Sequence, residues 1–297
     1  MMNLKSFVHI PLFLVVFLHI SNAQSGTELS LGIDEFLSKT RPEYLGKKLG
    51  LCTNTGGVNH TGQRTIELLE QEFGLDLLLT LDDWNDTTTF SDNRTSVIVE
   101  GHSFEKINIS GILPVQIVEL IKDLDVLFVD LQGIGIRSQS YTVTLQHLLY
   151  AGGIASTSII ILDRPNPLGG EMVSGNIPQD SLGSPGSFIP IPYRHGMTIG
   201  ELARLLNTEN DHGADLMIIP MDNWQGQPWG EIGLDWTPIS PGISTVGDLE
   251  RFTITSILGA DEILENGVST DRPYEILVHP KITSGSDIVF ALDELDL

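Results

Sequence analysis

The 297-residue chain has a single cysteine and few basic residues. Cys52 has no partner for an intramolecular disulfide, so the fold must be stabilised by its core alone. Lysine and arginine total 16 against 39 aspartates and glutamates, which gives a formal charge of −23. Nucleic acids and anionic membrane surfaces both bind to basic faces, so this acidity excludes them as partners. A hydrophobic fraction of 41% indicates a folded protein with a sizeable core.

The sequence also lacks the motifs of several common catalytic and cofactor sites. Its eight histidines show neither His-x-His nor His-Glu-x-x-His spacing, and no Gly-x-Ser-x-Gly elbow is present. Gly133 and Gly135 form a Gly-x-Gly motif without a third glycine or an acidic ribose ligand. A nucleotide-binding protein is therefore a weak alternative, and we expect neither a metal nor a cofactor. Cys52, inside an apolar run, is expected to be a buried hydrophobic residue.

The amino terminus has the pattern of a secretory signal peptide. Lys5 precedes an apolar run over residues 7–18, and small residues lie at 21 and 23. A signal anchor is the alternative, but Pro11 breaks a run shorter than the roughly 20 residues that span a bilayer. We expect cleavage after Ala23, a secreted or periplasmic protein, and no membrane contact thereafter. Removal of residues 1–23 takes away only Lys5, so the mature charge is 15 − 39 = −24.

Apolar runs alternate with helical patterns along the rest of the chain. The runs are too continuous for half-exposed strands and lie at 48–53, 75–81, 125–131, 158–162 and 215–220. Helical patterns lie at 27–40, 62–73, 114–123, 139–151 and 198–206. Thr198 followed by Glu201 forms a capping box at the start of the last helix. The sequence therefore predicts an α/β fold with a parallel sheet covered on both faces, and a polar functional loop or insertion at 82–111.

Polar residues follow four of the predicted strands. They are Asn54, then Asp82 and Asp83, then Asp130 and Gln132, and finally Asp163, Arg164 and Asn166. Ligands of open α/β sheets bind outside the carboxyl ends of the strands, so these side chains predict a pocket for a polyhydroxylated or anionic ligand. The alternative for any one of them is a structural role in a helix cap or an Asx-turn.

Two other polar groups extend this predicted site. Arg137 and Tyr141 follow the third strand, and Arg194 and His195 come just before the helix that begins after Thr198. Cationic side chains near a helix amino terminus favour an anionic ligand, because the helix dipole acts in the same sense. His195 is equally well explained as a hydrogen-bonded structural histidine.

Several motifs resemble one family, the exo-β-N-acetylmuramidases of the NamZ type. The similar segments are Thr53–Val58, Asp130–Arg137, Leu162–Gly170, Ile191–Ala203 and Pro220–Trp224. The resemblance implies a Rossmann-like main domain over 24–245 and a small C-terminal α/β segment over 246–297 that is a partial domain, with a cleft between them. It further implies a secreted hydrolase of the cell wall that removes N-acetylmuramic acid from the non-reducing ends of peptidoglycan fragments.

The resemblance also implies roles for the polar residues. Where the family has a Pro-Glu-His-Gly segment with its glutamate, this chain has Asp82 and Asp83, so one of these is the predicted general acid, with Asp130 or Asp163 as the second carboxylate. The remaining predicted residues bind substrate, and the arginines among them pair with the lactyl carboxylate of muramic acid; they are Asn54, Gln132, Arg137, Tyr141, Arg164, Asn166, Arg194 and His195. The alternative is a non-catalytic protein that binds muramyl sugars or cell-wall fragments and has lost the catalytic glutamate.

Overall fold

A seven-stranded sheet forms the centre of the computed structural model, which describes residues 29–81, 94–99, 101–138, 140–178, 189–240, 242–259, 266–267, 270–276 and 278. The strands are β1 (Leu49–Thr53), β2 (Leu77–Thr80), β3 (Arg94–Val99), β4 (His102–Asn108), β5 (Val126–Asp130), β6 (Ser158–Leu162) and β7 (Leu216–Ile219). Their order in the sheet is β3-β4-β2-β1-β5-β6-β7, and all are parallel except β3, which runs antiparallel to β4.

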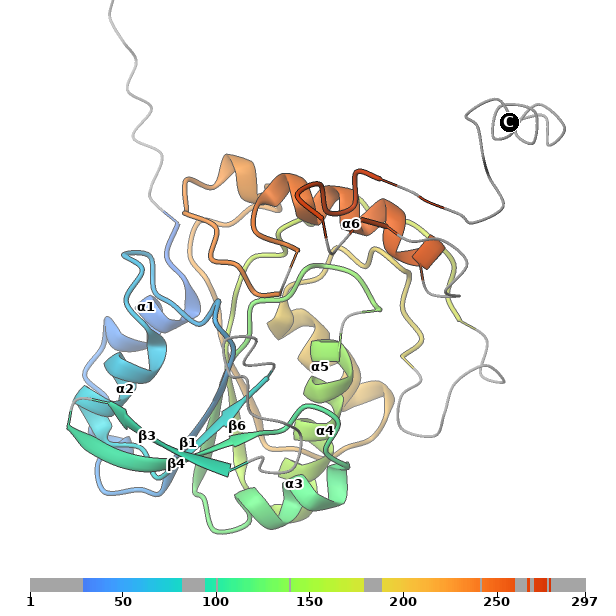
Figure 1. Cartoon of the computed structure of the whole chain (residues 1–297). Coiled ribbons are helices and arrows are strands. Elements are labelled where there is room, and N and C mark those ends of the chain that lie inside the picture. The colour runs from blue at the N-terminus through green and yellow to red at the C-terminus, as the bar shows by residue number, and fades with distance from the viewer. Residues whose placement is uncertain are drawn as a thin grey trace, which may run out of the picture.

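Helices cover both faces of the sheet (Figure 1). One face packs against α1 (Gly32–Leu37) and α2 (Thr65–Phe73) through a core that includes Phe36 and Phe128. The other face packs against α3 (Pro114–Ile121), α4 (Ser140–Ala155) and α5 (Ile199–Glu209). Strands buried on both faces need apolar side chains at successive positions, which is why their sequences are continuous apolar runs. The predicted α/β fold with a parallel sheet is confirmed.

The prediction of a polar loop or insertion over residues 82–111 is wrong for its second half. β3 and β4 form an antiparallel hairpin there, and β4 adds to the sheet parallel to β2, with Leu79 opposite Ile107. The charged residues Glu105 and Lys106 made the sequence of β4 look like a loop, because side chains of strands near a sheet edge can remain in solvent. Asp82 and Asp83 lie outside the described residues, so their predicted role stays a prediction.

Cys52 is fully buried in β1, and burial raises the pKa of its thiol. This confirms the prediction of a small core residue and argues against a nucleophile, because a reactive cysteine needs a lowered pKa.

None of the helices in the described part of the chain is long and apolar enough to cross a bilayer. The predicted signal peptide lies outside the described residues and stays a prediction.

The described part of the C-terminal segment packs onto the sheet domain. α6 (Val246–Gly259) buries Leu249 completely in the larger core, and Phe252 packs against the same core. The hydroxyl groups of Tyr193 and Ser256 are hydrogen bonded, and the rings of Phe252 and Tyr274 lie 5.0 Å apart. α6 is therefore connected to the main domain by apolar and polar contacts, while the predicted boundary at residue 245 stays a prediction.

Candidate functional site

The sheet has a topological switch point between β1 and β5. β2 and β4 lie on one side of β1, whereas β5, β6 and β7 lie on the other. Such a switch leaves a crevice outside the carboxyl ends of the two strands, the place where open α/β sheets bind ligands. Asn54 and Gln132 meet there: Asn54 Nδ2 donates to the Gln132 carbonyl at 2.9 Å, and the Gln132 amide donates to Asn54 Oδ1 at 3.2 Å. Two predicted site residues thus join the strand ends.

Arg164 and Asp130 form an ion pair beneath this edge. The guanidinium contacts both carboxylate oxygens, with Nη2 at 3.0 Å from Oδ2, and the two side chains are 2% and 0% exposed. Thr65 donates its hydroxyl to Asp130, and Arg164 also donates to the carbonyl of Val58. Because Asp130 has no exposed surface, its carboxylate holds Arg164 and α2 in place and does not face solvent. Its predicted catalytic role gains no support from this geometry.

Asp163 follows β6 in the sequence, and its carboxylate contacts the first residues of α5. Its Oδ1 accepts from the amides of Arg164 at 2.9 Å and Gly200 at 2.8 Å, and its Oδ2 accepts from the Thr198 hydroxyl at 3.0 Å. Burial raises the pKa of Asp163 to about 6, although these three donors lower it. The predicted capping box is confirmed, since Thr198 and Glu201 exchange hydrogen bonds at 3.1 and 2.9 Å. All these contacts give Asp163 a structural role, and a catalytic one stays a prediction.

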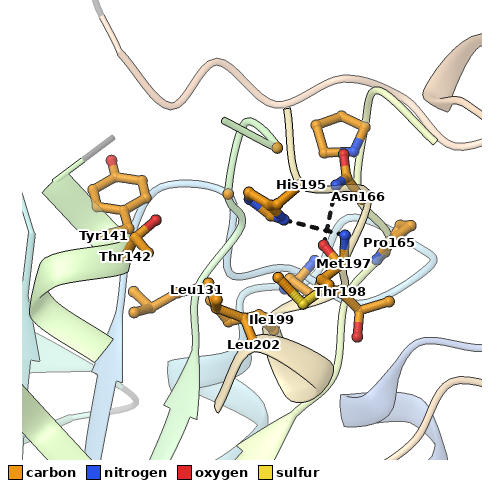
Figure 2. Close-up of a pocket in the computed structure, with 14 residues that line it drawn as sticks. Leu131, Tyr141, Thr142, Pro165, Asn166, His195, Met197, Thr198, Ile199 and Leu202 are labelled. Atoms are coloured by element: carbon orange, nitrogen blue, oxygen red, sulfur yellow. Dashed lines mark hydrogen bonds between the residues drawn. The ribbon is translucent and has the colours of Figure 1, made fainter. Parts of the chain in front are cut away.

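A shallow hollow lies beside α4 and the start of α5 (Figure 2), and its volume of about 360 Å³ includes open solvent at its mouth. Its apolar wall comes from Leu131, Ile199 and Leu202, and its polar wall includes Tyr141, Thr142, Asn166 and His195. We call it the His195 hollow. It brings together four predicted residues from separate parts of the chain, namely Tyr141, Arg164, Asn166 and His195. Thr142 and Met197 were not predicted, because the sequence around each is typical of a helix or its start.

His195 is 8% exposed, and its Nδ1 accepts a hydrogen bond from the Met197 amide at 3.1 Å. In the neutral ring the proton is therefore on Nε2. Burial lowers the pKa of His195 to about 4, so the imidazole is neutral at neutral pH. A neutral ring of this tautomer donates a hydrogen bond from Nε2 to a ligand oxygen, but it supplies no positive charge.

Asn166 fixes the turn after β6 by using both ends of its amide. Nδ2 donates to the Met197 carbonyl at 3.0 Å, and Oδ1 accepts from the Leu168 amide at 3.0 Å. Gly135 lies against it with φ +82°, and an added Cβ at this position would be 2.2 Å from Asn166 Oδ1. Gly135 therefore lets the backbone come close to the Asn166 side chain. This contact explains the glycine without the phosphate of a nucleotide.

Arg137 and Arg194 hold the chain that leads into α5. Arg137 Nη1 donates to the carbonyls of Asn176 and Ile191 at 2.7 and 2.6 Å. Arg194 donates to the carbonyl of Leu168 and lies 3.1 Å from the Met172 sulfur. Within the described residues neither arginine has a carboxylate partner, so no neighbouring negative charge offsets either guanidinium. Arg164, in contrast, is neutralised by Asp130, which leaves Arg137 and Arg194 as the better candidates for attracting an anion.

Thr65, which donates its hydroxyl to Asp130, was not predicted from the sequence as part of the site. It is the first residue of α2 and lies 65 positions before Asp130, so no local pattern connects the two.

A possible metal site receives no support: over the residues that the structure describes, no three side chains of histidine, cysteine, aspartate or glutamate come together.

The sequence of the chain matches a family of known proteins. A family model described as "Exo-beta-N-acetylmuramidase NamZ, N-terminal" matches residues 49–247. The peptidoglycan beta-N-acetylmuramidase NamZ of Bacillus subtilis (strain 168) is 30% identical over 261 residues, which cover 86% of this chain and 63% of that protein. The chain thus spans less than two thirds of this relative's length.

Two solved structures have the same fold, both of DUF1343 family proteins from Bacteroides fragilis NCTC 9343. The first is 27% identical with a TM-score of 0.75, and the match covers 91% of this chain and 70% of the other. The second is 23% identical with a TM-score of 0.69, covering 87% and 69%. The second likeness concerns the fold alone.

Proposed function

Because the chain belongs to the family of NamZ exo-β-N-acetylmuramidases, we propose that it is a secreted peptidoglycan glycosidase that removes N-acetylmuramic acid from non-reducing ends. One observation carries the proposal: the segment that matches the family, 49–247, contains both strand ends of the switch point and the whole described wall of the His195 hollow. The site is thus built from the part of the chain that is shared with the family.

The described side chains suit recognition of an acidic sugar. The His195 Nε2 proton and the hydroxyl of Thr142 lie at a hollow with an apolar wall, the mixture that sugar rings require. Arg137 and Arg194 do not line the hollow, but Arg194 precedes His195 in the chain and the Arg137 amide donates to the Tyr193 carbonyl, so both bring positive charge to its neighbourhood. A guanidinium binds carboxylates such as the lactyl group of muramic acid. Tyr141 donates its hydroxyl to the Ile239 carbonyl at 3.1 Å, which positions its ring.

The reaction needs a general acid and usually a second carboxylate. Asp130 and Asp163 are buried and occupied by several donors, so we assign them to positioning Arg164 and α5. The proposed acid is Asp83, with Asp82 as its alternative. Both follow β2 in the sequence, and β2 is the neighbour of β1 at the switch point.

The test is release of the chromophore from an aryl N-acetylmuraminide by the full chain. We expect turnover by the wild type and a decrease of roughly 10²–10⁴-fold in Asp83→Ala, the usual contribution of a general acid. Asp123→Ala, which removes an exposed aspartate after α3, is the matched control and should keep wild-type turnover. Equal turnover by wild type and Asp83→Ala would exclude Asp83 as the acid.

A second function is favoured because the carboxylates of Asp130 and Asp163 already accept hydrogen bonds from the protein itself. With neither carboxylate facing the His195 hollow, the protein would bind muramyl sugars or cell-wall fragments without cleaving them. Binding of N-acetylmuramic acid by the wild type, together with no chromophore release at any pH between 4 and 8, is the result that would establish this function and exclude the glycosidase.

A further inference from the structure

Residues 171–177 form an exposed segment that pairs with the chain just before His195. All of them are exposed. The Ser174 amide donates to the Arg194 carbonyl at 3.0 Å, and the Arg194 amide donates to the Ser174 carbonyl at 2.9 Å. We call residues 171–177 the Met172 strap. An exposed segment with few backbone hydrogen bonds opens readily, so a single added contact changes how often the strap leaves Arg194.

Met172 is the most exposed of the described methionines. Its side chain is 56% exposed, compared with 48% for Met217, whereas Met197 and Met221 are partly buried. Oxidants convert the thioether of methionine to a sulfoxide, and access to the sulfur decides which side chains react first. Met172 and Met217 are therefore the two described sulfurs that a dissolved oxidant reaches most easily.

Arg194 distinguishes Met172 from Met217. Arg194 Nη1 donates to the Met172 sulfur at 3.1 Å, and Nη2 donates to the carbonyl of Leu168. A thioether sulfur is only a weak acceptor, so the cationic donor is poorly used in this contact. Arg194 Nε has no hydrogen-bond partner among the described residues. Met217 lies on β7, and its sulfur accepts no hydrogen bond within the described part of the chain.

We propose that Met172 is a modification site, at which a peroxide oxidises the thioether to a sulfoxide that Arg194 then holds. The O–O bond of the peroxide breaks, and one oxygen forms the new S–O bond. The proton of that oxygen passes to the other oxygen, which leaves as water. The sulfur is oxidised by two electrons and the peroxide is reduced by two. This modification is independent of the proposed function, since it needs neither a substrate nor turnover.

The new oxygen changes the contact with Arg194. A sulfoxide is polar, so its oxygen accepts a charge-assisted hydrogen bond from Nη1 that is stronger than the bond to sulfur. The same arginine pairs with Ser174 through its backbone, so the sulfoxide fastens the Met172 strap at a second point. Oxidation thus reduces the opening of the strap beside His195 and occupies one of the guanidinium donors of Arg194.

The first experiment treats the full chain with hydrogen peroxide at pH 7 and follows each methionine by peptide mapping with mass spectrometry. We expect Met172 and Met217 to form sulfoxides first, with Met197 and Met221 slower by roughly threefold or more because they are partly buried. A Met172 that stays reduced while Met217 is oxidised would overturn the inference.

The second experiment measures hydrogen exchange of the Ser174 amide. We expect exchange slower by roughly threefold or more in the oxidised wild type, and also in untreated Met172→Gln, whose side-chain carbonyl replaces the sulfoxide oxygen. Met217→Leu is the matched control and should keep the slowing after oxidation, whereas Met172→Leu should lose it. Circular dichroism checks that each variant is folded.

A further variant tests the role of Arg194 as the partner. Arg194→Gln removes the guanidinium, so oxidation should no longer slow the exchange of Ser174. Slowing that persists in folded Arg194→Gln would contradict the pairing, because another group would then hold the sulfoxide. Unchanged exchange in both the oxidised wild type and Met172→Gln would overturn the inference even where Arg194→Gln does not fold.

Discussion

The polar residues at the strand ends divide into a buried network and an open set. Asp130, Arg164, Asp163 and Asn54 are each almost completely covered and bonded to one another or to the backbone. His195 instead lines an open hollow, and the Oε1 atom of Gln132 has no hydrogen-bond partner among the described residues. The same sequence pattern, a polar residue after an apolar strand, produces both. Burial does not separate the two sets, since Asn54 and His195 are both 8% exposed; the number of hydrogen-bond partners distinguishes the scaffold of the site from its binding surface.

Removing Arg164 should have the largest effect on stability. Arg164→Met leaves the carboxylate of Asp130 buried without its cation, and breaking such a pair typically destabilises by about 3–5 kcal/mol. Urea denaturation followed by circular dichroism measures the free energy of unfolding, with Arg204→Met on the exposed face of α5 as the control. A loss below about 1 kcal/mol would place Arg164 in the open set and contradict the division.

The pH dependence of stability should reveal two opposing groups. The pKa of Asp163 is raised to about 6, so the folded protein holds a proton that the unfolded chain loses, and this contribution is lost as pH rises from 4 to 6. The pKa of His195 is lowered to about 4, so its contribution is lost as pH falls from 6.5 to 4. Each amounts to about 2–3 kcal/mol, and in the wild type they largely cancel.

Single variants should remove this cancellation. In Asp163→Asn the free energy of unfolding should rise between pH 4 and 6 by about 2 kcal/mol more than in the wild type. In His195→Asn, which keeps an acceptor for the Met197 amide, it should fall by a similar amount over the same range. Urea titrations at half-unit pH intervals give both curves. Parallel curves for the wild type and both variants would show that neither group has the shifted pKa.

Two glycines with the same φ of +82° provide a smaller and more local comparison. At Gly135 an added Cβ would lie 2.2 Å from Asn166 Oδ1, whereas at Gly62 nothing lies within 4 Å. Gly62→Ala should therefore lose only about 1 kcal/mol, the strain of a left-handed alanine. Gly135→Ala should lose a further 1–2 kcal/mol because the turn held by Asn166 must shift. Equal losses, measured by thermal denaturation, would mean that Asn166 moves aside freely.

Much of the fold could be predicted because buried parallel strands require continuous apolar runs. Those runs located β1, β2, β5, β6 and β7, and the capping box at Thr198 located the start of α5. The hairpin of β3 and β4 could not be found in the same way. A strand near the sheet edge has polar residues such as Glu105 and Lys106, which look like a loop in the sequence.

The grouping of the polar side chains at the strand ends was predictable, but their individual contacts were not. The rule that ligands bind at the carboxyl ends of parallel strands correctly brought Asn54 and Gln132 together at the switch point. It could not tell that Arg164 pairs with Asp130, 34 positions away, while one oxygen of Gln132 has no partner in the part of the chain that the structure describes. Such choices depend on contacts between distant segments, which no local pattern specifies.

His195 is the open residue that allows the most direct test of the division. His195→Asn keeps the acceptor for the Met197 amide but removes the Nε2 donor from the hollow. At pH 7 we expect a free energy of unfolding within about 1 kcal/mol of the wild type, because neither form is charged there.

The decisive measurement is the rate of chromophore release from an aryl N-acetylmuraminide by His195→Asn at pH 7, with the folded fraction determined on the same sample. The account predicts turnover reduced at least tenfold in a fully folded variant. Wild-type turnover by folded His195→Asn would contradict it, because the hollow would then have no part in the reaction.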